Sequence, residues 1–400
     1  MKKILLAMAA LLLISGVGIG QVPVTRKKKQ EATEQTAAPK PKPTAKPKHK
    51  AKQSSGESAV ASTNQPSTEE VYRRGYEAFA DKNYPEAFKW FRKAAEQGNE
   101  EAQYNVGLMY IKGLGVSADL SQAAAWYKKS VDQGFAPAQY NLALLYRDGK
   151  GVTPDYKESA RLFMLAAEQG DAKAQLEIGR CYMLGWGVSE DGVESVKWMR
   201  KAAEQEEVDA QYYLGMIYEN GVSAESDLDE AVKWYRKAAN HGKAEAQYSL
   251  GRMYNTGIGV SHDNSEAFVW YRMAAEQGMD LAMLQLGIMY ENGIGVKENK
   301  PAAAGWYRKA ADKDNAPAQY LLAEMYYDGK GLKKDKAEAA KWYRKAATNG
   351  HATAQYSIGY MYEKGDGIAK DKAEAIHWYR KAADQGLTLA KSALKRLGIK

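Results

Sequence analysis

Residues 246–280 read AQYSLGRMYNTGIGVSHDNSEAFVWYRMAAEQGMD, and this pattern recurs along most of the chain. Self-similarity at a fixed period between about 20 and 50 residues indicates a stacked-repeat protein, in which each repeat contacts mainly its neighbours. A length of 400 residues therefore requires no division into globular domains. The alanine that opens each copy returns every 36 residues without a slipped position, at Ala102, Ala138, Ala174, Ala210, Ala246, Ala282, Ala318, Ala354 and Ala390.

Each copy contains two runs with the 3.6-residue period of an amphipathic helix. Between them, the glycines at 257 and 259 end the first helix, and Gly278 is placed to cap the second. The pattern predicts an all-α protein, an α-solenoid of stacked antiparallel helix pairs. The apolar or small residues of the first run are Ala246, Leu250, Gly251, Met253 and Tyr254, and those of the second are Ala267, Phe268, Trp270, Tyr271, Ala274 and Ala275.

The pattern Ala-x-x-x-Leu-Gly-x-x-Tyr-x-x-Gly-x-Gly-Val, followed by Ala-x-x-Trp-x-x-x-Ala-Ala-x-x-Gly, resembles the Sel-one-like repeat family, a longer relative of the tetratricopeptide repeat. Eight copies carry it, over residues 102–389. The resemblance implies a right-handed α-solenoid whose members act as adaptors for protein complexes, in bacteria often in the cell envelope. A cysteine-rich branch of the family is credited with binding or hydrolysing penicillin-type compounds. This chain has a single cysteine, Cys181, so that activity is not carried over.

The two ends of the chain differ from the repeats. Residues 1–20 have the basic start, apolar run and small residues of a signal peptide, with cleavage expected after Gly20. The alternative is an uncleaved membrane anchor, although the apolar run is short for a spanning helix. Residues 69–101 form a shorter unit that resembles a tetratricopeptide repeat and is predicted to cap the N-terminal end, and residues 390–400 are predicted to form a C-terminal capping helix. We expect a periplasmic or secreted protein.

The net charge of +8 comes from the N-terminal region. Residues 1–52 carry 12 Lys and Arg against two acids, whereas the rest of the chain carries 45 basic against 47 acidic residues. A nucleic-acid-binding solenoid would carry positive charge along its repeats, so this class is excluded. Residues 21–68 are rich in Lys and Pro and predict a disordered basic linker. Its basic part, residues 26–52, is interpreted as a solvated tether, with contact to an envelope polymer or an anionic membrane surface as the alternative.

No catalytic, cofactor or metal site is predicted. The Gly-x-Gly loops follow helices and lack a phosphate-binding lysine, which argues against a nucleotide site. Ser392 and Lys395 have the Ser-x-x-Lys spacing of penicillin-interacting serine enzymes, but the companion motifs are absent. Cys181 lies on an apolar face and is interpreted as a small core residue. The histidines fall in unrelated positions and are interpreted as surface residues: His49, His241, His262, His351 and His377.

Positions 3, 6 and 10 after the anchor alanine share one face of each first helix, and their residues vary while the core positions repeat. In tetratricopeptide-like stacks the first helices line the concave side, so this stripe is predicted to bind a protein or peptide, with a merely solvated face as the alternative. Trp186, in a loop, is a further candidate contact unless it folds over a neighbouring repeat. The candidate stripe residues are Asn105, Asn141, Glu177, Arg180, Tyr213, Met216, Ser249, Arg252, Gln285, Ile288, Leu321, Glu324, Ser357 and Tyr360.

The sequence thus predicts a non-enzymatic scaffold or adaptor of the bacterial cell envelope that binds protein partners through the concave face. Two alternatives stay open. One is a protein that binds cell-wall glycan through the basic arm and tyrosines. The other is a penicillin-interacting serine hydrolase that uses Ser392.

Overall fold

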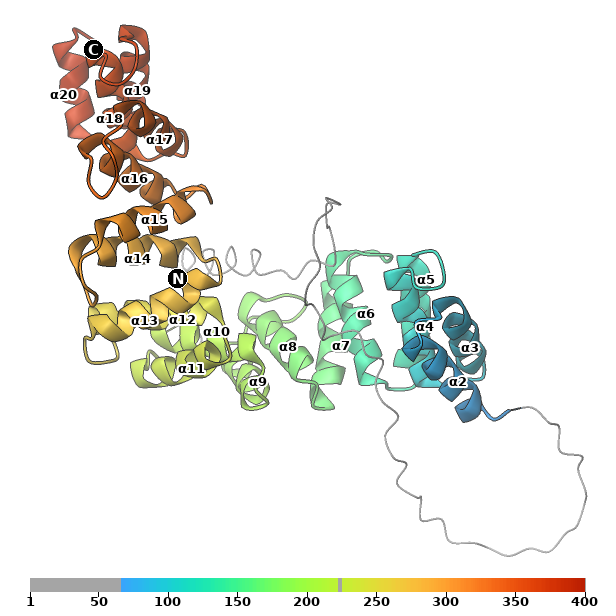
Figure 1. The fold of residues 1–400 in the computed structure, drawn as a ribbon. Coiled ribbons are helices and arrows are strands. Elements are labelled where there is room, and N and C mark those ends of the chain that lie inside the picture. The colour runs from blue at the N-terminus through green and yellow to red at the C-terminus, as the bar shows by residue number, and fades with distance from the viewer. Residues whose placement is uncertain (1–65, 222–224, 400) are drawn as a thin grey trace, which may run out of the picture. The chain divides into compact units, whose positions relative to one another are not determined.

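The computed structural model describes residues 66–221 and 225–399, and every regular element within them is an α-helix (Figure 1). The predicted all-α solenoid class is confirmed. Consecutive helices form antiparallel pairs, one pair for each 36-residue copy. The helices are α2 (Thr68–Ala80), α3 (Tyr84–Glu96), α4 (Glu100–Lys112), α5 (Leu120–Val131), α6 (Ala136–Asp148), α7 (Tyr156–Glu168), α8 (Ala172–Leu184), α9 (Gly192–Glu204), α10 (Val208–Asn220), α11 (Leu228–Asn240), α12 (Ala244–Thr256), α13 (Asn264–Glu276), α14 (Asp280–Asn292), α15 (Lys300–Ala311), α16 (Ala316–Asp328), α17 (Lys336–Thr348), α18 (Ala352–Lys364), α19 (Lys372–Asp384) and α20 (Thr388–Arg396).

The chain divides into two compact units, Met1–Gln205 and Glu206–Lys400, here called unit 1 and unit 2. The helices of unit 1 run from α2 to α9, and those of unit 2 from α10 to α20. The predicted signal peptide and the linker up to residue 65 lie outside the described residues, and α2 begins at Thr68. Among the described helices, none has the length and apolar character to span a membrane.

Within a pair, the two helices approach closely because the first carries glycine or alanine five residues after the anchor alanine. A Cβ atom added to Gly251 would lie 2.7 Å from the ring of Tyr271, a buried residue of the second helix. Gly215 and Gly287 face Tyr235 and Tyr307 in the same way. The anchor alanines are fully buried where these helices meet, so small residues set the spacing and the tyrosine rings fill the remaining volume.

The loop between the paired helices is fixed at both ends. Gly257 ends α12 with φ +70°, in the left-handed region that favours glycine. Asp263 then caps α13, because its carboxylate accepts hydrogen bonds from the backbone nitrogens of Ser265 and Glu266 at 2.8 and 3.1 Å. The second loop glycine packs against the preceding pair. A Cβ on Gly295 would lie 2.0 Å from the carbonyl oxygen of Asn264, the first residue of α13.

Successive pairs are joined by buried glutamines. Gln247, one residue after an anchor alanine, donates from its side-chain nitrogen to the carbonyl of Ala239 at the end of α11, at 3.0 Å. Its side-chain oxygen accepts a hydrogen bond of 2.8 Å from Gln277, which follows α13. One amide thus links three successive helices. Gln103 and Gln175 in unit 1 and Gln355 in unit 2 make the same pair of bonds, and Gln319 differs only in accepting its second bond from Asn349.

Within the described structure, the first helix pair and the last helix, α20, each pack on one neighbouring pair only. In the first pair, Val71, Tyr72 and Phe91 are buried against each other and against α4. At the other end, α20 buries Ala393 and Leu394 against α19. Its remaining side is exposed and basic, with Lys391, Lys395 and Arg396.

Candidate functional site

The predicted stripe lies on the first helices of the pairs: α4, α6 and α8 in unit 1, and α10, α12, α14, α16 and α18 in unit 2. Its open part is narrower than the sequence predicts. Five of its residues are buried: Asn105, Glu177, Tyr213, Met216 and Ser249. Eight are half-buried, namely Asn141, Arg180, Arg252, Gln285, Ile288, Leu321, Glu324 and Ser357, and Tyr360 is 37% exposed.

Four of the five buried residues stand at position 3, and within a unit this side of a first helix packs on the preceding pair. The side-chain nitrogen of Asn105 donates to the hydroxyl of Tyr72, 3.3 Å away in the first pair. Asn141 likewise donates to the hydroxyls of Tyr104 and Tyr127, at 3.3 and 3.4 Å. Position 3 therefore joins consecutive repeats. In the described structure, positions 6 and 10 carry most of the accessible surface of the stripe.

In unit 1, the stripe holds a network of charged side chains. The carboxylate of Glu177 pairs with Arg147 at 3.1 Å and with Arg180 at 3.0 Å. Arg147 also pairs with Asp148, which in turn meets Lys150 at 3.1 Å. Although partial burial opposes it, hydrogen bonds from Arg147 and Lys150 hold the pKa of Asp148 below its ordinary value. These charged side chains are therefore largely paired with one another within unit 1.

Trp186 lies against the preceding repeat. Its ring centroid is 6.2 Å from that of Tyr156, at the start of α7, and the Arg180 guanidinium lies 6.0 Å from the Trp186 ring. The indole is half-buried and packs on the core of unit 1. This geometry favours the alternative reading of Trp186, in which it covers its neighbour. In the same repeat, burial raises the pKa of the Cys181 thiol to about 12, so the thiol stays protonated at neutral pH.

In unit 2, the first helices carry carboxylates, at or beside the stripe, that are bound by buried tyrosines. The hydroxyl of Tyr235 donates to Glu219 at 2.8 Å, that of Tyr307 to Glu291 at 2.7 Å, and that of Tyr379 to Glu363 at 2.9 Å. Tyr343 donates to Glu324 in the same manner. Of these residues, only Glu324 is predicted from the sequence as part of a site. The signal was the glutamate at position 9 of several first helices, 16 residues before a second-helix tyrosine.

A cavity of about 310 Å³ opens on this face of unit 2, between α16 and α18. The Tyr343 hydroxyl stays protonated, because burial and the neighbouring Glu324 raise its pKa well above the ordinary value. The cavity combines four aromatic rings with two carboxylates, a composition suited to a cation. Its lining residues are Glu324, Tyr327, Asp328, Tyr343, Tyr356, Ser357, Tyr360 and Met361.

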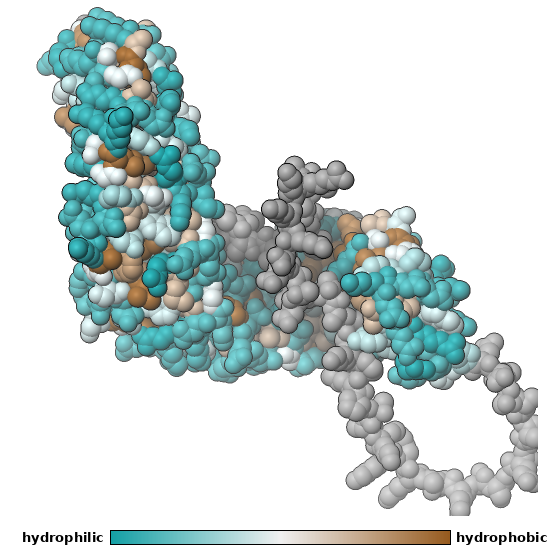
Figure 2. All heavy atoms as spheres, viewed as in Figure 1, coloured by the Kyte–Doolittle hydropathy of each residue, from teal (hydrophilic) through white to brown (hydrophobic). Residues whose placement is uncertain are grey.

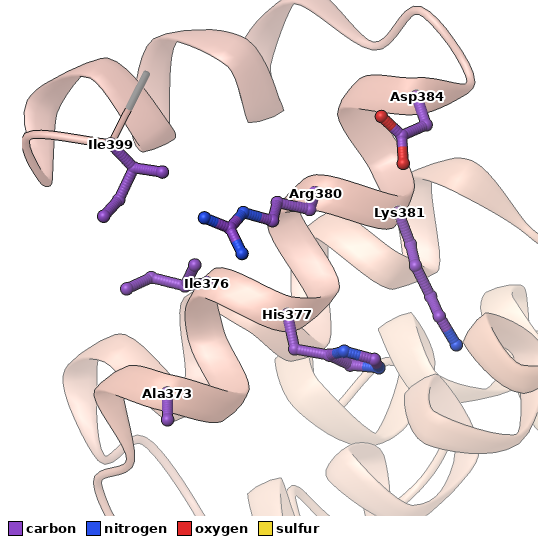
Figure 3. A pocket seen from close by; sticks show the side chains of 7 residues that line it. All are labelled: Ala373, Ile376, His377, Arg380, Lys381, Asp384 and Ile399. Carbon is purple, nitrogen blue, oxygen red and sulfur yellow. The ribbon is translucent and has the colours of Figure 1, made fainter.

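A second pocket lies away from the stripe, on α19 beside the C-terminal residues (Figure 3). In Figure 3 the Arg380 guanidinium extends toward Ile376 and Ile399, whereas His377 and Lys381 point to the other side of the helix. These side chains do not converge on one point. Ser392 lies on α20, and both it and Lys395 are exposed. In the described ranges, no group of three His, Cys, Asp or Glu residues is placed to hold a metal ion.

The surface of both units is mainly hydrophilic in the view of Figure 2, with apolar residues in scattered patches. Exposed large apolar residues on the second helices include Val193, Val269 and Met273. They lie outside the stripe and provide matched controls for experiments on it.

The repeat geometry agrees with comparisons to known proteins. The family model of the Sel1 repeat matches nine consecutive segments: residues 70–99, 100–135, 136–171, 172–207, 208–243, 244–279, 280–315, 316–351 and 352–387. The chain belongs to the Sel1 repeat family. The matched Sel1 segments correspond to the helix pairs from α2 and α3 through α18 and α19, and they include the short first pair. Among curated proteins, no relative matches the chain.

Solved structures of Sel1 repeat proteins resemble this chain. A protective antigen present in uropathogenic Escherichia coli strains, described as displaying an SLR fold, is 35% identical with a TM-score of 0.65, and the match covers 84% of this chain and 81% of the antigen. A Sel1 repeat protein from Oxalobacter formigenes is 32% identical with a TM-score of 0.64, and the match covers 86% of this chain and 98% of that protein. Sel1 repeat proteins generally act as protein-interaction scaffolds.

Proposed function

We propose that this Sel1 repeat protein is a non-enzymatic scaffold of the bacterial cell envelope, which binds partner proteins through the open part of the first-helix stripe. One observation carries the proposal. The core positions repeat from pair to pair, whereas positions 6 and 10 vary and, apart from the buried Met216, remain at least partly accessible. A surface on rigid helices with mixed apolar, aromatic and charged side chains suits a protein segment better than a polyanion.

Photo-crosslinking tests which face binds. A photoreactive phenylalanine analogue is placed singly at Thr256, Asn292 or Tyr360 on the stripe, in the full chain expressed in its own cells. The matched controls carry it at Val193, Val269 or Met273, which are exposed on second helices. We expect the stripe positions to yield one shared protein adduct that the controls lack. Adducts from the control positions alone would place binding on the other side of the repeats and contradict the proposal.

The envelope location rests on the N-terminal sequence. Residues 1–20 have the pattern of a signal peptide and the basic residues 26–52 follow as a tether. A similar protein is a protective antigen in uropathogenic Escherichia coli strains, which supports exposure outside the cytoplasm. The test is fractionation of cells that express the full chain, with N-terminal sequencing. We expect a periplasmic or secreted protein that begins at Gln21. A cytoplasmic protein that retains residues 1–20 would contradict the location and leave the scaffold role intact.

The two alternative functions give different results. A glycan-binding protein would sediment with purified wall polymer, and truncation of residues 26–52 would abolish this. A serine hydrolase would be labelled covalently by a fluorescent penicillin, and Ser392→Ala would remove the label. We expect neither result.

A further inference from the structure

Lysines distinguish the last three helix pairs of unit 2 from the pairs before them. At positions 15, 16 and 18 after the anchor alanine, these three copies carry seven lysines. The five copies that begin at residues 102–246 carry no lysine or arginine at the same positions. Positions 15 and 16 lie in the loop within a pair, and position 18 is the first residue of the second helix. The seven are Lys297, Lys300, Lys333, Lys334, Lys336, Lys370 and Lys372.

These lysines share one edge of unit 2, because each loop rests on the start of the preceding second helix. A Cβ atom added to Gly331 would lie 2.5 Å from the carbonyl carbon of Lys300. One added to Gly367 would lie 2.6 Å from the carbonyl oxygen of Lys336. The three pairs follow one another from α14 to α19 (Figure 1). Their seven lysines, here called the lysine edge, stand outside the stripe, whose positions are on the first helices.

Most of the lysine edge carries charge that the protein does not neutralise. Two of its members are ion-paired, Lys300 with Glu298 at 3.1 Å and Lys336 with Asp366 at 2.7 Å. The other two acids of these loops cap α17 and α19 through their carboxylates. Five exposed lysines therefore have no ion pair within the described part of the chain: Lys297, Lys333, Lys334, Lys370 and Lys372.

The composition of the lysine edge indicates the kind of partner. None of the large exposed apolar residues of the described structure lies within 293–302, 329–338 or 365–374, and these segments contain no arginine. Protein interfaces are enriched in aromatic residues, methionine and arginine and depleted in lysine, and surfaces that bind single-stranded nucleic acid place aromatic rings between the basic residues. Lysine is a compact, hydrated charge that suits diffuse attraction to many anionic groups.

We infer that the lysine edge adsorbs unit 2 to a membrane surface rich in anionic phospholipid. Clusters of lysine near a membrane are attracted by the negative potential of its headgroups, and each lysine adds to the attraction. Binding of this kind needs no pocket and no apolar insertion. The inference goes beyond the scaffold role, since it assigns a second surface that leaves the stripe free for a protein partner.

The test is cosedimentation with lipid vesicles, using protein purified from cells that express the full chain. One set of vesicles contains equal parts of phosphatidylglycerol and phosphatidylethanolamine, and the other contains phosphatidylcholine alone. We expect binding to the anionic vesicles that is at least about tenfold stronger than to the neutral ones and that weakens as salt is added. Equal binding to both kinds of vesicle, or to neither, would overturn the inference.

A variant of the five unpaired lysines locates the surface. Each is replaced by a residue that an earlier copy carries at the same position and that the fold therefore accommodates, as in Ser117, Ala118 and Asn264. We expect binding to the anionic vesicles to weaken at least about tenfold. The changes are Lys297→Ser, Lys333→Ser, Lys334→Ala, Lys370→Ala and Lys372→Asn.

The control removes the same charge from five exposed lysines elsewhere, and it should bind nearly as well as the unaltered chain. Because all three proteins keep residues 26–52, this segment cannot account for a difference between them. Equal binding by the two variants would overturn the assignment to the lysine edge. Displacement from the vesicles by linear polyphosphate, at the same concentration of phosphate, would overturn the choice of a membrane in favour of a soluble polymer. The control changes are Lys112→Ser, Lys128→Ser, Lys157→Ser, Lys173→Ser and Lys313→Ser.

Discussion

Single residues at fixed positions hold the repeats together, and the glutamine that follows the anchor alanine is the clearest case. Gln247 is 1% exposed, and its amide satisfies a helix-end carbonyl on one side and a glutamine on the other. Buried polar groups stabilise a fold only when they are paired in this way, since an orphaned group costs about 1–3 kcal/mol. At the same position α14 has Met283, an apolar residue that needs no partner.

Gln247→Met, which copies Met283, is expected to destabilise unit 2 by about 1 kcal/mol, because the carbonyl of Ala239 loses its side-chain donor and keeps only the backbone nitrogen of Gly242, and Gln277 loses its acceptor. The measurement is urea unfolding of the full chain, followed by circular dichroism. Met283→Leu is the control, since it alters a buried apolar residue without a hydrogen bond and should cost less. Equal shifts of the unfolding midpoint in the two variants would contradict the role of the amide.

Asp314 adopts φ +61° at the position where most repeats have glycine. A residue with a side chain loses about 1–2 kcal/mol in this left-handed conformation, so Asp314→Gly is expected to raise the stability of unit 2 by about 1 kcal/mol. Thermal unfolding provides the measurement. Asp312→Gly removes the same charge at φ −69°, where glycine is unfavourable, and should lower the stability. A lower melting temperature for Asp314→Gly would show that the backbone conformation is not the controlling factor.

At the scale of the helix, caps and loop contacts determine where each element ends. Most second helices begin after an aspartate whose carboxylate accepts backbone hydrogen bonds, and every first helix from α4 to α18 ends at a left-handed glycine, whereas α2 ends at Asp81. First helices begin more variably. Asn315 caps α16 and His351 caps α18, whereas Met279 makes no side-chain cap for α14.

His351 makes the stability of unit 2 depend on pH. Its Nδ1 accepts a hydrogen bond of 3.2 Å from the backbone nitrogen of Ala354, which requires an unprotonated Nδ1, and burial lowers the pKa of this histidine. The unfolded chain, with a pKa of about 6.5, therefore binds the proton more readily than the folded chain. The stabilisation is complete above about pH 6.5 and declines as the pH falls below it.

His351→Asn keeps a cap of the kind seen at Asn315 and removes the titrating group. We expect the variant to lose less stability than the unaltered chain between pH 7 and pH 5, as measured by urea unfolding at each pH. The exposed His377→Asn should leave the pH dependence as it is. Identical pH profiles for His351→Asn and the unaltered chain would contradict the assignment.

The second loop glycine is expected to be the least replaceable residue of the loop. Gly295→Ala would place Cβ 2.0 Å from a backbone oxygen of the preceding pair, at φ +66°. We expect a loss of about 3 kcal/mol or more in thermal unfolding, since backbone on both sides resists movement. Gly350→Ala, with φ +89° and open space around Cβ, should cost only about 1–2 kcal/mol. Equal losses of stability in the two variants would contradict the claim that the close contact with the preceding pair makes Gly295 difficult to replace.

At the scale of the whole molecule, the 36-residue period predicts the helices and their pairing because the core positions recur. The period does not predict which side of a first helix is open. Asn105 and Glu177 differ in identity and yet both are buried, because each contacts the preceding pair of its unit. Residues therefore vary from repeat to repeat both where they contact the neighbouring repeat and where they are exposed to solvent. The cavity between α16 and α18 is lined by Glu324 and Ser357, which stand at variable positions, and no periodic rule identifies it.

The most direct test of the central claim is the affinity for the partner identified by crosslinking, measured with two triple variants of the full chain. One replaces the stripe residues as Asn292→Ala, Asp328→Ala and Tyr360→Ser. The other replaces exposed second-helix residues as Val193→Ser, Val269→Ser and Met273→Ser. We expect the stripe variant to bind at least about a hundredfold more weakly, a loss of about 2.7 kcal/mol, and the control to bind like the unaltered chain. Equal affinity of the stripe variant and the unaltered chain would contradict the claim that the first-helix face is the binding surface.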